Sequence, residues 1–129
     1  MIMKQKKRVY ISGKIGEEIL SDETIAKFKN AEELLEKNGW VARNPTCKLY
    51  QEFLNKHLKC EKRAHLIFKD RGFDRYKSAL LYDFIHISDC DAIYMLKDWE
   101  ESPGATAEYY FAKACGKEII LEKDYIDNV

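Results

Sequence analysis

The chain has 129 residues, a length typical of one domain, and its 22 Lys and Arg residues balance 22 Asp and Glu residues. A hydrophobic share of 46% with zero formal net charge excludes an intrinsically disordered chain, and the lack of basic excess argues against binding of a nucleic acid polymer. No apolar run is long enough for a membrane span or a signal peptide, so we expect a cytoplasmic protein without a membrane partner.

Hydrophobic patterning predicts strands that alternate with helices along one domain, residues 1–129. Ser21 and Ser102 are suited to cap helices, and Pro103 suits a first helical position. In chain order, the pattern predicts a frayed terminus at 1–7, a strand at 8–13, a helix at 22–38, a strand at 40–44, an irregular insertion or lid at 45–75 with a helix at 50–59, a helix at 76–88, a strand at 92–96, a polar loop at 97–101, a helix at 103–115 and a strand at 118–121.

This alternation predicts an α/β fold of three layers, α/β/α, with a small parallel sheet between helices. Ligands of such sheets bind beyond the carboxyl ends of the strands. Three segments are expected at that edge: residues 12–16, 44–46 and 97–104. They define where a site should be sought.

Two acids fall at positions where the predicted helices should be apolar. Asp83 lies three residues after Leu80 and four before Ile87. Glu108 lies three residues before Phe111. Residues three or four apart share a helix face, so both carboxylates are expected on faces that meet the sheet. A carboxylate there is costly unless it is paired or hydrogen-bonded.

The direction of these side chains favours a common site. Side chains lean toward the N-terminus of their helix, which lies near the ligand edge in an α/β unit. Asp83 and Glu108 should therefore lean toward that edge, where Tyr10 of the first strand could offer a hydroxyl. A single acid in such a place is more often a flank residue that reaches solvent, but two acids aimed at one edge favour a functional pair.

Paired carboxylates beside a helix start suit glycosidic chemistry. One carboxylate can attack an anomeric carbon while the other acts as acid, base or orienting group. A nucleophilic Glu108 must be ionised, which a hydrogen bond from Tyr10 would favour. The helix that begins at Ser102 and Gly104 offers free N–H groups and a positive dipole end, which suit a phosphate.

Three segments then carry a resemblance to a known family. Residues 9–13 (VYISG), 82–96 (YDFIHISDCDAIYML) and 102–108 (SPGATAE) resemble, in order and spacing, the nucleoside 2-deoxyribosyltransferase superfamily. The likeness is to its deoxynucleoside 5'-monophosphate N-hydrolase branch and to a small phage-associated branch. It implies a flavodoxin-like or Rossmann-like sheet. It also implies glycosidic chemistry on deoxynucleosides or their monophosphates.

The resemblance also implies roles for single residues. Glu108 matches the nucleophile, Asp83 the acid that assists at the sugar and base, and Tyr10 the residue that positions the nucleophile. Asp91 matches an acid that we interpret as structural. Ser102 stands where the N-hydrolase branch has a serine that contacts the 5'-phosphate, whereas base-exchanging transferases tend to have an acid there. A nucleotide substrate is therefore favoured.

Other residues near the predicted edge could bind substrate. Ser12 and Gly13 belong to the first loop, and Lys14, where the N-hydrolase pattern has a serine, could pair with a phosphate or be solvated. Trp99 could stack on a base. Thr106 replaces a glycine of the family pattern, which could narrow the sugar pocket.

The expected function is that of an N-glycosidase-type enzyme that cleaves or exchanges the base of nucleosides, 5'-monophosphates in particular. The alternative is a non-catalytic nucleotide-binding or sensing module on the same fold. No cofactor is expected, because two carboxylates suffice. No metal is expected either, since the spacing of Cys47, His57, Cys60 and His65 matches no zinc motif. The family tends to form oligomers, so we expect a homo-oligomer.

Overall fold

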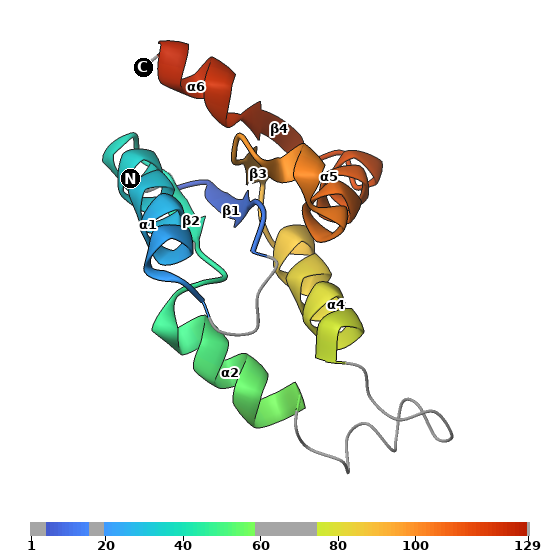
Figure 1. Ribbon diagram of the computed structural model, residues 1–129. Coiled ribbons are helices and arrows are strands. Elements are labelled where there is room, and N and C mark those ends of the chain that lie inside the picture. The colour runs from blue at the N-terminus through green and yellow to red at the C-terminus, as the bar shows by residue number, and fades with distance from the viewer. Residues whose placement is uncertain (1–4, 16–19, 59–74, 129) are drawn as a thin grey trace.

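A four-stranded parallel sheet forms the centre of the part of the chain that the structure describes. The structure is a computed structural model, and it describes residues 5–15, 20–58 and 75–128 (Figure 1). The strand order is β2-β1-β3-β4. The strands are β1 (Arg8–Ser12), β2 (Val41–Arg43), β3 (Ala92–Met95) and β4 (Glu118–Leu121).

Helices cover both faces of this sheet. The hydrophobic core on one face joins β1 and β3 to α1 (Asp22–Lys37), with α6 (Glu122–Asn128) packed against it. The core on the other face joins the same strands to α4 (Arg75–Ser88) and α5 (Pro103–Ala114). Figure 1 shows α1 and α4 on opposite sides of β1. The predicted three-layer α/β/α architecture is confirmed.

The order of the strands fixes where a ligand can enter. The chain passes from β1 through α1 to β2 on one side, and later returns to place β3 on the other side of β1. Helices on the two sides of such a reversal diverge, and a crevice opens beyond the carboxyl ends of the two central strands. The α2 helix (Lys48–Leu58) extends beyond this edge and contacts α4 (Figure 1).

The predicted starts and ends of the main helices are confirmed. The Ser21 and Ser102 side chains each accept a hydrogen bond from a backbone N–H in the first turn of α1 and α5. Gly39 and Gly116 follow these helices with φ values of 91° and 72°, a region that side chains disfavour. Serine and glycine therefore set the lengths of both helices.

Three parts of the sequence prediction need correction. The helix predicted at 50–59 is confirmed as α2, which begins two residues earlier, so this part of the predicted insertion at 45–75 is regular. Residues 59–74 lie outside the described part. The predicted loop at 97–101 contains a 3-10 turn, η1 (Trp99–Glu101). The α6 helix was missed because a single aromatic ring, that of Tyr125, anchors it against Tyr94. Among the described helices, none is long and apolar enough to cross a membrane.

The predicted structural role of Asp91 fits its position. Its carboxylate accepts a hydrogen bond of 2.8 Å from the backbone N–H of Arg8, the first residue of β1. Arg8 and Asp91 lie at the amino ends of the central strands, away from the ligand edge. The contact ties β1 to the turn that precedes β3.

The turn after β1 passes very close to the end of β3. A Cβ atom on Gly13 would lie 2.6 Å from Cδ1 and 2.9 Å from Cβ of Leu96. Both distances are shorter than side chains tolerate, and Leu96 is itself buried. Only glycine lets the end of β1 approach β3 this closely.

We expect Gly13→Ala to lower the free energy of unfolding by about 1–3 kcal/mol, the usual cost of overpacking. Urea denaturation measures the loss. Gly104→Ala is the matched control with a smaller expected loss, because its Cβ would lie 3.2 Å from the Tyr76 hydroxyl, at the far end of a side chain, and 3.8 Å from Ser102 Oγ. Wild-type stability of Gly13→Ala would contradict the close approach.

Candidate active site

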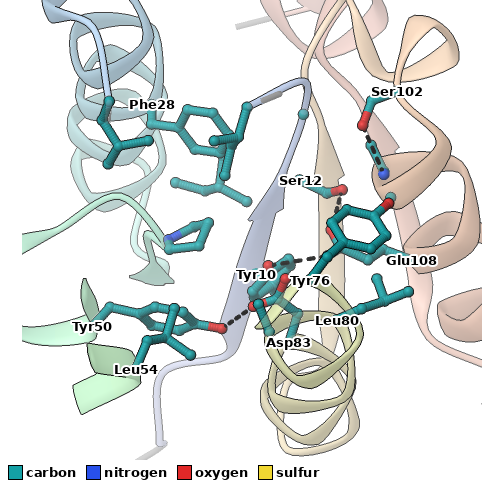
Figure 2. A pocket seen from close by; sticks show the side chains of 18 of the residues that line it. Tyr10, Ser12, Phe28, Tyr50, Leu54, Tyr76, Leu80, Asp83, Ser102 and Glu108 are labelled. Carbon is teal, nitrogen blue, oxygen red and sulfur yellow. Dashed lines mark hydrogen bonds between the residues drawn. The ribbon is translucent and has the colours of Figure 1, made fainter. Parts of the chain in front are cut away.

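A cavity of about 540 Å³ lies at the carboxyl edge of β1 (Figure 2). Its walls come from β1 and the loop that follows, from α2 and α4, and from the first turns of α5. One part is polar and contains Asp83 and Glu108. Another part is apolar and includes Phe28, Pro45 and Leu54. The volume lies within the range of small-molecule sites.

Glu108 is buried at the back of this cavity. Its side chain is 6% exposed. Ser12 Oγ donates a hydrogen bond of 2.7 Å to Oε1, and Tyr10 Oη lies 3.5 Å from Oε2, at the limit for a hydrogen bond (Figure 2). Tyr10 and Ser12 are two residues apart on β1, so both face the α5 side of the sheet. The strand period therefore supplies two hydroxyls to one carboxyl group.

Asp83 reaches the same place from α4. The Tyr50 hydroxyl of α2 donates a short hydrogen bond to Oδ1 of Asp83 (Figure 2). Asp83 lies close enough to Glu108 and Tyr10 for these groups to influence one another's pKa. The structure thus brings together the two acids and the tyrosine that the sequence had paired.

Burial and proximity raise the pKa of both acids. For Glu108, burial is the main cause and the neighbouring charge of Asp83 is the second, so its pKa lies well above the usual value. For Asp83, burial raises the pKa, while hydrogen bonds from neighbouring groups oppose the rise. Two adjacent buried carboxyls avoid double ionisation by retaining a proton between them. Burial also raises the pKa values of Tyr10 and Tyr50, which keeps both hydroxyls as donors.

The first turn of α5 forms the far end of the cavity. Ser102 Oγ accepts a hydrogen bond of 3.1 Å from the N–H of Ala105, and the Ser102 carbonyl accepts one from Thr106. Pro103 has no N–H to offer. The N–H of Gly104, in contrast to those of Ala105 and Thr106, has no hydrogen-bond partner among the described residues. Free backbone N–H groups at a helix start are suited to anions.

Four of the six predicted substrate-binding residues line the cavity, namely Ser12, Gly13, Ser102 and Gly104. Two lie elsewhere. The Lys14 side chain is exposed, while its N–H donates to Asp98. Trp99 stacks on Tyr109 with ring centroids 4.6 Å apart and packs against the core.

Sequence reasoning missed several residues of the cavity. Tyr50 and Leu54 lie on α2, within the segment that gave the weakest pattern. Tyr76 of α4 lies with its hydroxyl near Gly104. For Tyr50, its place at the start of a predicted helix was the one available signal. No local pattern connects Tyr50 to Asp83, which is 33 residues away.

No group of three or more metal-ligating side chains occurs among residues 5–15, 20–58 and 75–128. Of the four zinc candidates weighed on sequence, Cys60 and His65 lie outside the described residues. The chemistry considered for the cavity therefore uses its carboxyl and hydroxyl groups.

Residues 7–121 match a family described as a domain of unknown function, DUF4406. The chain belongs to the DUF4406 family. No curated protein matches it significantly in sequence. The whole sheet, both acids and every cavity residue named above lie within the matched segment.

Solved structures identify the fold. The chain is similar to a 2-deoxyribosyltransferase from the psychrotolerant bacterium Bacillus psychrosaccharolyticus, with a TM-score of 0.55 and 16% identity over 88% of this chain and 70% of that one. It is also similar to the CMP N-glycosidase BcmB of Clostridium botulinum, with a TM-score of 0.48 and 19% identity over 89% of this chain and 67% of that one. The expected likeness to the deoxyribosyltransferase fold is confirmed by the first of these.

The raised pKa of Glu108 has a consequence for stability. An unfolded glutamate loses its proton near its ordinary pKa of 4.5, whereas in the native state the buried pair of Glu108 and Asp83 keeps one proton to higher pH. The native state therefore binds more protons above that pH, and the free energy of unfolding falls as pH rises toward the raised pKa. We expect Glu108→Gln to be more stable than the wild type at pH 8, by about 1 kcal/mol or more.

This stability advantage of Glu108→Gln should shrink toward pH 5, because less free energy is then needed to keep native Glu108 protonated and as neutral as a glutamine. Urea denaturation across that range measures it. Glu100→Gln, at an exposed position in η1, is the control and should follow the wild type. Equal stability of Glu108→Gln and wild type at every pH would show that Glu108 is not buried as an acid.

Proposed function

We propose that this protein is an N-glycosidase-type enzyme that cleaves or exchanges the base of nucleosides, with 5'-monophosphates as the preferred substrates. One observation carries the proposal: two buried, hydrogen-bonded carboxyl groups face a nucleotide-sized cavity at the carboxyl edge of the sheet. The fold shared with a 2-deoxyribosyltransferase supports sugar chemistry at this edge.

In the proposed reaction, Glu108 acts as the nucleophile. Its carboxylate attacks the anomeric carbon, and the bond between that carbon and the base nitrogen breaks. Asp83 gives its proton to the departing base, which leaves a glycosyl ester on Glu108. A water molecule, or a second base, then attacks the anomeric carbon and gives a proton back to Asp83, which frees Glu108.

The reaction needs one proton on the pair, carried by Asp83 while Glu108 is ionised. Two buried neighbouring carboxyls hold one proton between them over a wide pH range, because a second negative charge is opposed by the first. Ser12 and Tyr10 donate hydrogen bonds to Glu108, and such donors favour its ionised form. At the moment of attack the shared proton must therefore lie on Asp83.

The ends of the cavity suit the two ends of a nucleotide. At the α5 end, the Ser102 hydroxyl and the Gly104 N–H can donate to a phosphate, and the helix dipole favours its charge. At the other end, Phe28, Pro45 and Leu54 offer apolar surface to a base. The two acids lie between these ends, near the expected place of the sugar (Figure 2).

We expect Glu108→Gln to lower the rate of base release by about 10³-fold or more, because no other group replaces the nucleophile. Liquid chromatography of a panel of nucleosides and 5'-monophosphates measures the release, with a second base added to half of the reactions. Glu100→Gln, at the exposed position in η1, is the control and should keep full activity.

Each result separates the possible activities. Release of base from monophosphates indicates hydrolysis, whereas a new nucleoside in the presence of the second base indicates transfer. An active Glu108→Gln variant would contradict the nucleophile. Saturable nucleotide binding without any release would favour the non-catalytic binding module instead.

The phosphate position has its own test. Ser102→Asp keeps a good helix cap but places a negative charge at the proposed phosphate site. We expect kcat/KM for 5'-monophosphates to fall by about tenfold or more, while kcat/KM for unphosphorylated nucleosides changes little. Ser102→Asn is the matched uncharged control. Equal losses for both substrate classes would place the phosphate elsewhere.

A further inference from the structure

Tyr50 provides a contact that the proposed reaction has not used. It lies near the start of α2, its side chain is 7% exposed, and its hydroxyl donates to Oδ1 of Asp83 (Figure 2). The two residues are 33 positions apart in the chain. This hydrogen bond joins α2 to the acid pair.

Aromatic packing fixes the Tyr50 ring. Tyr82 and His86 of α4 lie with ring centroids 5.0 Å and 4.9 Å from that of Tyr50. Phe53, one turn further along α2, stacks on Tyr82 at 4.9 Å. These four rings form an aromatic cluster between α2 and α4, and a ring held on several sides keeps its hydroxyl in one place.

The groups that face Asp83 come from three neighbouring elements. Tyr10 of β1 and Glu108 of α5 approach from the sheet side, and Tyr50 approaches from α2. Tyr82, next to Asp83 on α4, has a pKa raised by burial and by the charge of Asp83. Tyr50 donates to Asp83 and Ser12 donates to Glu108, while Tyr10 lies at the hydrogen-bond limit from Glu108. Each carboxyl therefore has one hydroxyl donor that the other does not share.

We propose that Tyr50 is a positioning residue for Asp83: its hydroxyl occupies Oδ1 and so directs the transferable proton to Oδ2. A carboxyl oxygen that accepts an O–H hydrogen bond is the poorer site for a proton, so the other oxygen carries it. The same bond fixes the rotation of the carboxyl group, which sets where Oδ2 points. This inference rests on the proposed function.

The test compares Tyr50→Phe with Tyr82→Phe. Both changes remove one hydroxyl from the aromatic cluster and keep the ring, but only Tyr50 bonds to Asp83. For Tyr50→Phe we expect kcat for base release to fall by about tenfold or more with little change in KM, since acid catalysis of this kind contributes about 10²–10⁴-fold. Tyr82→Phe should keep the wild-type kcat.

The pH profile provides a readout that packing alone would not move. Loss of a donor to the ionised form raises the pKa of Asp83, which must be protonated to act as the acid, so the basic limb of the kcat/KM profile should shift upward by about one pH unit. Carboxyl NMR of the free protein with ¹³C-labelled Asp residues should show the same upward shift. Tyr82→Phe should leave both measurements unchanged.

A double-variant cycle separates positioning from folding. In Asp83→Asn protein, Tyr50→Phe should cause no further loss of kcat, because its effect passes through the carboxyl group. Multiplied losses would overturn the proposal, as would an unshifted Asp83 titration in Tyr50→Phe. If the wild type releases no base, the proposed function fails, and the NMR titration still decides whether Tyr50 controls the Asp83 proton.

Discussion

Two carboxyl groups, Asp83 and Glu108, are buried side by side next to β1, and the site depends on the groups around them that offset the cost of this burial. Burial of one ionised carboxylate is costly, and burial of two adjacent ones more so. Hydroxyls of Ser12, Tyr10 and Tyr50 donate to the pair, and burial raises the pKa of both carboxyls. Such an arrangement destabilises the fold and is typical of sites where stability is traded for activity.

The fold brings this pair together from distant parts of the chain. Asp83 is on α4, Glu108 on α5 and their hydroxyl donors on β1 and α2. The reversal of strand order at β1 opens the crevice in which all four elements meet. Gly13 lets the turn after β1 pass close to Leu96, and the preceding Ser12 bonds Glu108. The rigid centre of the molecule therefore sets the geometry of the acids, and α2 adds a wall.

The two ends of the cavity follow different physical rules. The α5 end relies on fixed backbone groups. Because Pro103 at the helix start has no N–H, the N–H of Gly104 is the donor that this end offers. The α2 end relies on apolar side chains and on one aromatic cluster. A shared fold at 16% identity to a 2-deoxyribosyltransferase is compatible with this division, since a backbone scaffold persists while wall residues change.

The sequence by itself determined the alternation of strands and helices, the two serine caps and the unusual placement of Asp83 and Glu108. These features depend on local periodicity and local hydrogen bonds, which can be predicted from short stretches of sequence. Lys14 and Trp99 do not line the cavity, because nearness to the ligand edge does not fix the direction of a side chain. Only the tertiary structure decided that Ser12 bonds Glu108 and Tyr50 bonds Asp83. These contacts join residues 96 and 33 positions apart, and packing of whole elements determines them.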